Sequence, residues 1–360
     1  LLDFAGGARH PITDPAFQGW FDACCERGLT VPTWPKAYGG AQLDRAESQI
    51  VREEMAAIGA PEPLVGMGIA MIGPTLLELG SDEQKARHLP GIARGEVRWC
   101  QGYSEPGAGS DLAALKTRAE DAGDYYLING SKIWTSGADE ADWIFCLVRT
   151  DPGAPKHEGI SFVLFSMDDP GVSVKPIVLI NGNSSFCECF FDDVKADKAD
   201  RIGEENRGWT IAKRLLQHER SFVSSGGAMA TSKPLPELAR ECLGHEPDSA
   251  RLDEVRRIQM DAAAFKLTQR RAAEENRDGG TQTFATSMFK YYATEILRRR
   301  MECAMSLLGT RGLGWEGHGF SASELKTTRA WLYGKAMTIA GGSSEVQLNI
   351  IAKRVLGLPD

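Results

Sequence analysis

The chain has 360 residues, of which 42% are hydrophobic and 25% are charged, and its formal net charge is −8. This composition is typical of a globular protein with enough apolar residues for two or three packed units. The acidic balance argues against nucleic acid as the main partner, because binding a phosphate backbone requires a basic surface.

The 8 cysteines form no CxxC pair and no cluster with histidine at zinc spacing, so no metal site is expected. Cys187 and Cys189 stand two apart in a strand-like run, which places both on one face of a sheet. Reduced thiols are the simplest interpretation. No apolar run reaches the roughly 18 residues that a membrane span needs, and no signal peptide is visible. We therefore expect a soluble, cytoplasmic protein that does not contact a membrane.

Residues 1–98 are expected to form an N-terminal helical domain. Between residues 44 and 58 the apolar side chains recur at helical spacing and group on one side: Ile50, Val51, Met55 and Ile58. Further on, Ser81 and Gln84 form a capping-box pattern that predicts the start of another helix.

Residues 99–200 are expected to form a middle β domain. Short runs rich in β-branched and aromatic residues occur at 125–128, 143–148, 160–165 and 186–191. Turn signals separate them at Asn129-Gly130, Asp151-Pro-Gly153 and Asp169-Pro-Gly171. No helix-length pattern interrupts these runs, so we expect an antiparallel sandwich or barrel instead of a fold with alternating strands and helices.

Residues 201–360 are expected to form a C-terminal helical bundle. Helical patterns cover residues 206–230, 250–277, 281–309, 321–334 and 343–356. Gly279-Gly280 and the pair Gly312 and Gly314 mark turns between them. The predicted fold class is therefore multi-domain α+β.

The first stretch that suggests chemistry is the glycine-rich loop at 100–111. Gly107 and Gly109 let backbone amides approach a ligand closely, and the hydroxyls of Ser104 and Ser110 stand on either side. Such a loop can hold a pyrophosphate through successive N–H groups. On composition alone, a tight turn is the favoured interpretation of this loop.

A second stretch runs from Asn129 to Gly137. Trp134 ends a predicted strand and is followed by the hydroxyl residues Thr135 and Ser136. An indole beside hydroxyl groups suits a flat heteroaromatic ligand, which it can contact through its ring while the hydroxyls bond the ligand edge. A core tryptophan at the end of a barrel is the alternative.

Together with five other stretches, these two motifs resemble the acyl-CoA dehydrogenase family, in order along nearly the whole chain. The matching stretches are WPKAYGG at 34–40, SEPGAGSD at 104–111, NGSKIWTSGA at 129–138, FFDDV at 190–194, GEENRGW at 203–209, LGTRGL at 308–313 and GGSSEVQ at 341–347. The resemblance implies an N-terminal helical domain, a middle antiparallel β-barrel and a C-terminal four-helix bundle, with FAD between barrel and bundle.

The resemblance also implies which residues bind FAD. Gln101, Tyr103 and Ser104 would meet the pyrimidine edge of the flavin. Trp134, Thr135 and Ser136 would lie against the isoalloxazine, with Ser136 near N5. The other implied cofactor residues are Gly109, Ser110, Gly309, Thr310, Ser343 and Glu345, and Ser110 would also contact the substrate where it meets the phosphates.

The general base departs from the commonest family pattern. Many members carry a glutamate where this chain has Gly341, so the usual base is absent. A smaller set, which includes the isovaleryl and long-chain enzymes, places it before an arginine on the first long bundle helix, and Glu219-Arg220 matches that arrangement. Glu219 is therefore the expected base, with Glu345 as the alternative, and His218 is only a neighbour on the helix.

The resemblance gives the surroundings of the base further roles. Gly341 would still offer its backbone N–H to the thioester oxygen, because that contact needs no side chain. Gln217 and Arg220 are further candidate substrate contacts on the helix that carries Glu219.

A second departure concerns partners. Members usually have an Arg-Phe-Gly element whose arginine reaches the FAD of a neighbouring subunit, and residues 231–258 contain no Phe-Gly pair. Either Arg240 or Arg251 replaces that arginine, or another chain supplies the contact. We expect a homo-oligomer, dimeric or tetrameric, that oxidises an acyl-CoA in lipid β-oxidation and passes electrons to an electron-transfer flavoprotein or a similar acceptor.

Two alternatives stay open. One is a subunit of a heterotetramer of the steroid side-chain type, in which two unlike chains share each FAD site. The other is an oxidase or a monooxygenase of the same fold. Glu219 counts against a monooxygenase, which needs no base for an α-proton.

Overall fold

The computed structural model describes residues 7–9, 11–224, 233–244, 249–277 and 285–359. The chain folds into two compact units. The N-terminal unit comprises Leu2–Val178 and Ser184–His218, and the C-terminal unit comprises Leu179–Asn183 and Glu219–Asp360. The predicted domains 1–98, 99–200 and 201–360 divide the chain more finely and stay a prediction.

The N-terminal unit begins with helices, as predicted. They are α1 (Pro15–Glu26), η1 (Lys36–Tyr38), α2 (Arg45–Ala57), η2 (Gly68–Ile72), α3 (Gly73–Leu79) and α4 (Asp82–Ala93). The capping box at Ser81 and Gln84 opens α4 as expected. In contrast, the apolar side of α2 is not buried in this chain, since Ile50 is 58% exposed and Ile58 is 74% exposed.

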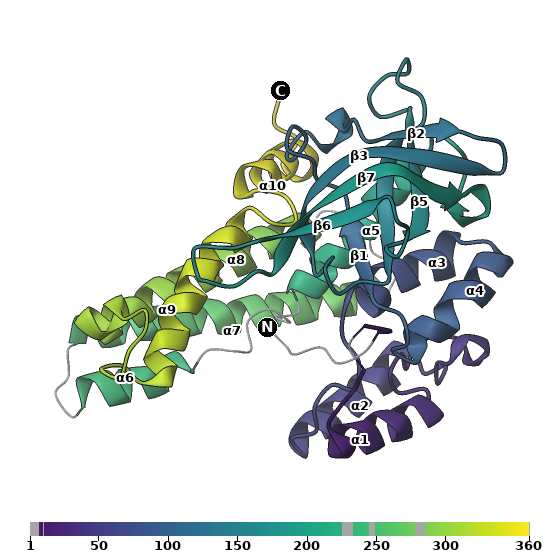
Figure 1. The fold of residues 1–360 in the computed structure, drawn as a ribbon. Coiled ribbons are helices and arrows are strands. Elements are labelled where there is room, and N and C mark those ends of the chain that lie inside the picture. The colour runs from purple at the N-terminus through teal and green to yellow at the C-terminus, as the bar shows by residue number, and fades with distance from the viewer. Residues whose placement is uncertain (1–6, 10, 225–232, 245–248, 278–284, 360) are drawn as a thin grey trace. The chain divides into compact units, whose positions relative to one another are not determined.

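The β region of this unit forms a sheet whose order along the described chain is β6-β7-β3-β2-β4-β5-β8, with β1 beside β4 (Figure 1). The strands are β1 (Trp99–Gly102), β2 (Arg118–Asp121), β3 (Tyr125–Ser136), β4 (Trp143–Arg149), β5 (Ile160–Ser166), β6 (Val172–Ile177), β7 (Phe186–Asp197) and β8 (Arg201–Ile202). The 3₁₀ turns η3 (Leu112–Ala114) and η4 (Lys198–Asp200) lie between strands. The four predicted strand runs are confirmed as parts of β3, β4, β5 and β7.

The sheet corrects two expectations. It is mixed instead of purely antiparallel, because β4 pairs in parallel with β1 and with β2. Asn129-Gly130 is not a turn but lies inside β3, where the register with β7 shifts. Gly130 has φ +149°, and a Cβ there would come within 2.7 Å of the Cα of Thr117, so the chain needs glycine for close approach at a bulge.

Helix α4 is bound to the segment that follows β7 by polar side chains. The Nε2 of Gln84 donates to the carbonyls of Ala199 and Arg201, each at 2.8 Å. The buried His88 lies with its Nε2 3.0 Å from Asp200 Oδ1, and its ring stacks edge-on against Trp99 and Trp143. These contacts join the helical and β parts of the N-terminal unit around one core.

Helix α5 (Gly208–Ser224) begins in the N-terminal unit, and the remaining helices belong to the C-terminal unit. They are α6 (Leu235–Leu243), α7 (Ser249–Arg277), α8 (Ala285–Leu308), η5 (Gly309–Leu313), α9 (Ala322–Gly334), η6 (Lys335–Thr338), α10 (Ser344–Ile350) and η7 (Ile351–Val355). Helix α8 packs against α6, α7, α9 and α10 and is the centre of this bundle (Figure 1). Sequence patterns predicted the long helices but missed α6, and the predicted residues 225–230 and 281–284 lie outside the described part.

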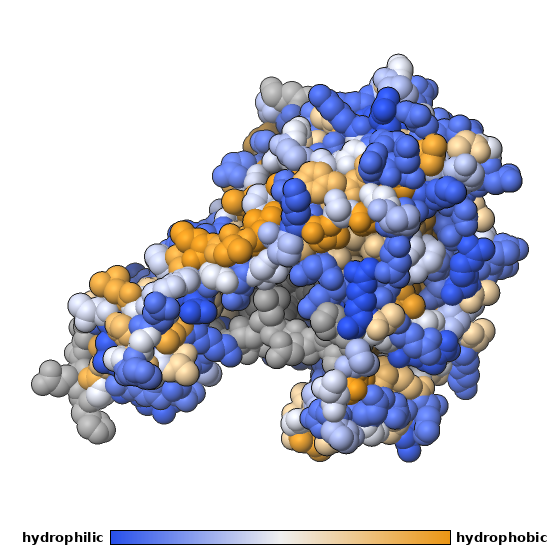
Figure 2. All heavy atoms as spheres, viewed as in Figure 1, coloured by the Kyte–Doolittle hydropathy of each residue, from blue (hydrophilic) through white to orange (hydrophobic). Residues whose placement is uncertain are grey.

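Hydrophilic residues cover much of the surface seen in Figure 2, and apolar residues reach it in patches. In the C-terminal unit the exposed large apolar side chains include Ile180, Leu313 and Ile339, which are 76%, 80% and 68% exposed. Within the described residues, no helix has both the length and the apolar character to cross a membrane.

Candidate active site

The two sequence motifs of the N-terminal unit are joined by a buried ion pair. The Nζ of Lys132, on β3, donates to Glu105 Oε1 at 2.8 Å and to the carbonyl of Tyr103 at 3.1 Å. Glu105 also accepts from the amides of Lys116 and Thr117 at 2.6 and 2.9 Å. Burial alone would raise the pKa of Glu105, but the charge of Lys132 and these hydrogen bonds outweigh it and lower the pKa. The pair therefore fixes the start of the glycine-rich loop against β3.

Trp134 lies two residues beyond Lys132 and is not a core residue. Its φ is +61°, a left-handed conformation that is rare for a bulky side chain, and the register between β3 and β7 shifts between Lys132 and Thr135. The indole is 54% exposed and meets Phe186 edge-to-face with ring centroids 6.2 Å apart. Strained backbone of this kind clusters at functional sites, so this bulge favours a ligand contact over the core alternative.

The side chains after Trp134 differ in exposure. Thr135 is fully buried, whereas Ser136 is half-buried at the end of β3, where it pairs with Phe186 of β7. Ser136 is thus better placed than Thr135 to reach a ligand through its hydroxyl.

The glycine-rich loop is open. Gly109 and Ser110 are exposed, and no atom lies within 4 Å of where a Cβ on Gly107 or Gly109 would stand. Within the described residues, the backbone bonds of this loop use the amides of Glu105 and Ala108 and not those of Gly109 and Ser110. The loop can therefore offer amides to a phosphate, and its glycines are not required by packing within this chain.

The residues that precede the loop lie deeper. Gln101 is half-buried on β1, and Ser104 accepts the amide of Ile133 through its carbonyl at 2.8 Å. The ring of Tyr103 is buried and stands edge-on to Phe145 and Phe162. Tyr103 is therefore mainly a packing residue of the core beneath the loop.

Glu219 lies on α5, and the side chains of Gln217, Glu219 and Arg220 fall outside the described part of the structure. The helix backbone still gives its register. Position 219 follows Leu215 by four residues, which places it on the face that carries buried Leu215 and Ala212.

The glycine turn between η6 and α10 contains two successive residues with positive φ, Gly341 at +66° and Gly342 at +95°. Ser343 caps α10 through a 3.3 Å bond from the amide of Val346. Glu345 is exposed, and hydrogen bonds from its own amide and from Ser343 lower its pKa. A lowered pKa makes a carboxylate a weaker proton acceptor, which counts against Glu345 as the base.

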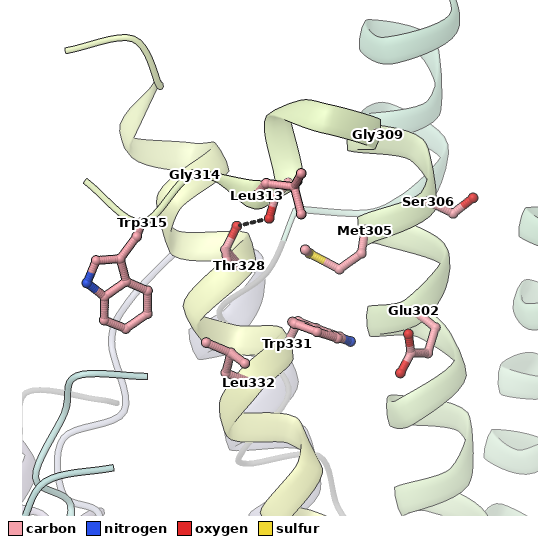
Figure 3. A pocket seen from close by; sticks show the side chains of 11 residues that line it. Glu302, Met305, Ser306, Gly309, Leu313, Gly314, Trp315, Thr328, Trp331 and Leu332 are labelled. Carbon is pink, nitrogen blue, oxygen red and sulfur yellow. Dashed lines mark hydrogen bonds between the residues drawn. The ribbon is translucent and has the colours of Figure 1, made fainter. Parts of the chain in front are cut away.

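A cavity of about 570 Å³ in the C-terminal unit includes the predicted residue Gly309. Figure 3 shows Trp331 and Leu332 of α9 and Met305 and Glu302 of α8 lining it. Thr328 donates to the carbonyl of Gly312 at 3.0 Å, which ties η5 to α9 (Figure 3). An apolar cavity with indole walls and a glycine rim suits a flat ring. Thr310 is exposed and does not line it.

Three family models match the chain in order. They are the N-terminal, middle and C-terminal domains of acyl-CoA dehydrogenase, at residues 9–96, 100–194 and 206–356. The chain belongs to the acyl-CoA dehydrogenase family. As an acyl-CoA dehydrogenase it is an FAD-dependent oxidoreductase of lipid metabolism.

Relatives of this acyl-CoA dehydrogenase include the acyl-CoA dehydrogenase IpdE1 of Mycobacterium tuberculosis, which is 37% identical over 95% of this chain and 88% of its own. Among solved structures, the Tcur3481-Tcur3483 steroid ACAD is 30% identical with a TM-score of 0.82, covering 98% of this chain and 91% of that chain. The ChsE4-ChsE5 complex from Mycobacterium tuberculosis is 31% identical with a TM-score of 0.78, covering 96% and 90%.

The observed residues of this acyl-CoA dehydrogenase fit FAD. The exposed indole of Trp134 on a strained bulge suits the isoalloxazine, and the open amides of Gly109 and Ser110 suit the pyrophosphate. The indole-lined cavity at Gly309 suits a second flat ring. Among the described residues, no group of three or more His, Cys, Asp or Glu side chains is arranged to hold a metal ion.

Sequence reasoning missed several residues of this acyl-CoA dehydrogenase site. Lys132 reads in the sequence as an ordinary polar strand residue, and Trp315 and Trp331 as bundle tryptophans. Arg329 stacks over the Trp315 ring at 4.8 Å and Lys335 over the Trp331 ring at 4.8 Å. In the sequence Trp315 stands close to Gly309–Leu313 but Trp331 does not, so no local pattern connects the two tryptophans to a cavity.

Proposed function

We propose that the protein desaturates an acyl-CoA thioester between Cα and Cβ, with Glu219 as the base that removes the α-proton. FAD, when bound, accepts the β-hydrogen as hydride at flavin N5. The observation that carries the proposal is the exposed Trp134 on its positive-φ bulge, two residues before Ser136 and two residues after Lys132, which the ion pair with Glu105 fixes. An exposed, rigid aromatic ring adds little to the packing of the sheet, but it can orient a planar cofactor.

The support for Glu219 is threefold. It matches the family position on α5, its helical register coincides with buried Leu215, and the alternative Glu345 is exposed with a lowered pKa. Position 341, where many members carry the base, holds glycine in the left-handed region. Desolvation by a docked thioester would raise the pKa of a carboxylate at 219 and make it a better base.

The remaining roles in the proposal follow the same logic. Gln101, Ser104, Trp134 and Ser136 hold the flavin ring, Gly109 and Ser110 hold its phosphates, and Gln217 and Arg220 contact the substrate. Gly309 and Thr310 contact the FAD of this or a neighbouring subunit. Gly309 does so from the cavity lined by Trp315 and Trp331, and Thr310 from outside it. Ser343 and Glu345 would bond FAD near the glycine turn. Thr135 and Tyr103, which are buried, shape the site by packing.

Replacing Glu219 and Glu345 separately by glutamine tests which of the two is the general base. We expect Glu219→Gln to lower kcat by at least about 100-fold, the low end of the contribution of a positioned general base. Glu345→Gln is the matched control, because it removes the same charge from the alternative candidate. A Glu219→Gln protein that desaturates acyl-CoA at the wild-type rate contradicts the assignment.

A second candidate arrangement is that the chain is one subunit of a heteromeric dehydrogenase for bulky, steroid-derived acyl-CoAs. Its support is the missing Arg-Phe-Gly element and the titles of two similar structures, a steroid ACAD of two named chains and the ChsE4-ChsE5 complex. Arg240 and Arg251 are both exposed and stay candidates for a contact with FAD across subunits. We also propose that the protein passes electrons to an electron-transfer flavoprotein and that it is cytoplasmic. All eight cysteine thiols are free, as expected of reduced cysteines.

Purification distinguishes the two arrangements. A homo-oligomer isolated alone is yellow, and a short, long, branched or sterol-derived acyl-CoA bleaches it under anaerobic conditions. A heteromeric subunit isolated alone is colourless and gains FAD only when a second acyl-CoA dehydrogenase chain is co-expressed. Rapid reaction of the reduced flavin with oxygen would instead indicate an oxidase.

A further inference from the structure

The glycine turn at 341–342 is held from inside the bundle by two buried polar side chains. Lys290, on α8, is 1% exposed, and its Nζ donates to the carbonyl of Gly342 at 2.6 Å and to that of Thr338 at 3.3 Å. Gln347, on α10, is also 1% exposed, and its Nε2 donates to the carbonyl of Gly341 at 3.2 Å. Carbonyls from the end of η6 and from both glycines are therefore directed at buried donors.

A buried ammonium group is costly unless dipoles or charges surround it, so its location is informative. Lys290 places its charge where backbone carbonyl dipoles converge on it from one short turn. This arrangement fixes the peptide planes that follow Gly341 and Gly342. Side-chain flexibility cannot relax it easily, because Lys290 and Gln347 are both enclosed by the bundle.

Fixing the carbonyls also fixes the amides. The described peptides contain no cis bond, and in a planar trans peptide the N–H of the next residue points opposite to the C=O. With the Gly341 carbonyl on Gln347 and the Gly342 carbonyl on Lys290, the amides of Gly342 and Ser343 point away from these two side chains. Neither amide donates to a backbone acceptor within the described part of the chain.

The backbone conformation of the turn favours glycine at both positions. Gly341 and Gly342 have φ of +66° and +95°, which L side chains adopt only under strain. A Cβ on Gly342 would also lie 2.6 Å from Gln347 Nε2. At Gly342 the chain thus needs glycine for close approach to the Gln347 side chain.

We propose that Lys290 and Gln347 are positioning residues that hold the Gly341–Gly342 turn, so that its backbone N–H groups, including that of Gly341, are fixed in place before the thioester carbonyl of the substrate docks. This inference rests on the proposed desaturation, in which negative charge develops on that carbonyl oxygen as the α-proton leaves. Backbone donors stabilise such charge most when they are fixed in advance. Lys290 and Gln347 do not touch the substrate and act through the turn.

The test uses Lys290→Met and Gln347→Leu in the FAD-loaded protein, with Thr294→Val as the matched control. Thr294 is buried on the same helix, one turn after Lys290, and within the described residues its hydroxyl bonds the carbonyls of Lys290 and Tyr291 in α8. The Thr294→Val substitution removes a buried polar group from α8 without affecting a contact to the glycine turn. Gln347→Leu is of similar size to the native residue and keeps the site buried.

The first readout is amide hydrogen exchange of the peptide that spans residues 338–344. We expect exchange to become at least about tenfold faster in Lys290→Met and Gln347→Leu and to stay unchanged in Thr294→Val. Unchanged exchange in both test variants overturns the anchoring. If Lys290→Met does not fold, Gln347→Leu decides by the same measurement.

The second readout is the split between kcat and KM. Displacing a fixed donor lowers kcat by about 100-fold while KM changes little, because the lost contact strengthens only in the transition state. Wild-type kcat in the test variants overturns the positioning role. If the wild-type protein desaturates no acyl-CoA, the proposed function fails, and the exchange rates alone then decide whether Lys290 and Gln347 anchor the turn.

Discussion

The Glu105–Lys132 pair makes a quantitative prediction, because its two side chains are only 8% and 0% exposed. Lys132→Met removes the cation and leaves the Glu105 carboxylate buried, still bonded to the amides of Lys116 and Thr117. Removing one partner of a buried pair typically costs about 3–5 kcal/mol. At about 2–4 °C per kcal/mol for a unit of this size, the Tm should fall by about 6–20 °C.

The pH dependence of that loss identifies its cause. In the wild type the pKa of Glu105 is lowered, so its contribution to stability is present above the unfolded pKa of about 4.3 and is lost as pH falls below it. In Lys132→Met the charge of Lys132 no longer offsets burial, so the pKa of Glu105 rises and the variant loses stability as pH rises. We therefore expect the Tm deficit to be smaller at pH 5 than at pH 8.

Thermal unfolding of the apoprotein followed by circular dichroism measures this deficit. Lys116→Met is the control, because it removes an exposed lysine beside the pair and keeps the backbone amide that Glu105 accepts. The double variant Glu105→Gln/Lys132→Met should regain part of the lost Tm, since no charge is left buried. A deficit that is equal at both pH values would refute the argument from an uncompensated charge.

The remaining predictions concern the flavin surface, the β3 bulge and the thiols. Trp134→Ala should weaken FAD binding by about 3–10-fold, the value of an aromatic contact. The Tm of the apoprotein should change little, because the indole is 54% exposed. Fluorescence titration with FAD measures the Kd, and an unchanged Kd contradicts the flavin role of Trp134. Gly130→Ala should lower the Tm more than Gly123→Ala. Both glycines have positive φ, but a Cβ at position 130 would also lie 2.7 Å from the Cα of Thr117, whereas a Cβ at position 123 would meet no atom within 4 Å. Equal losses of Tm would argue against the steric explanation. Burial raises the pKa of Cys146 and Cys189 to about 12. Maleimide should therefore label exposed Cys242 in the native protein and leave Cys146 and Cys189 unmodified until the protein unfolds. Mass spectrometry identifies the labelled cysteines, and labelling of Cys146 in the native protein would contradict its burial in the core.

The strands that were predictable are those whose side chains face the core in unbroken apolar runs, such as 143–148 and 160–165. Strand β6 was missed because Lys175 and Pro176 interrupt its pattern. The sheet order explains why proline is tolerated, since β6 lies at an edge, where one side of the strand needs no hydrogen bond from its neighbours. Asn129-Gly130 was wrongly predicted to be a turn, because the residue pair that favours a hairpin turn also suits a bulge within a strand.

For the site, the family motifs marked the positions that we propose bind FAD and substrate, through short-range patterns such as the glycine loop and the strand end at Trp134. The residues that hold those positions were not predictable. Lys132 meets Glu105 across 27 residues of chain, and Lys290 meets Gly342 across 52. Nothing near a lysine in the sequence reveals that its ammonium group will be enclosed and bonded to a distant turn.

Enclosure also protects Lys132 and Lys290 from covalent damage. A lysine amine attacks a thioester only when the two groups can meet, and side chains that are 0% and 1% exposed do not meet a CoA ester in solution. Spontaneous acylation in a protein that handles such esters would fall on surface amines such as Lys116. The two lysines on which the architecture of the site depends are thereby kept out of reach of the reactive compounds on which it acts.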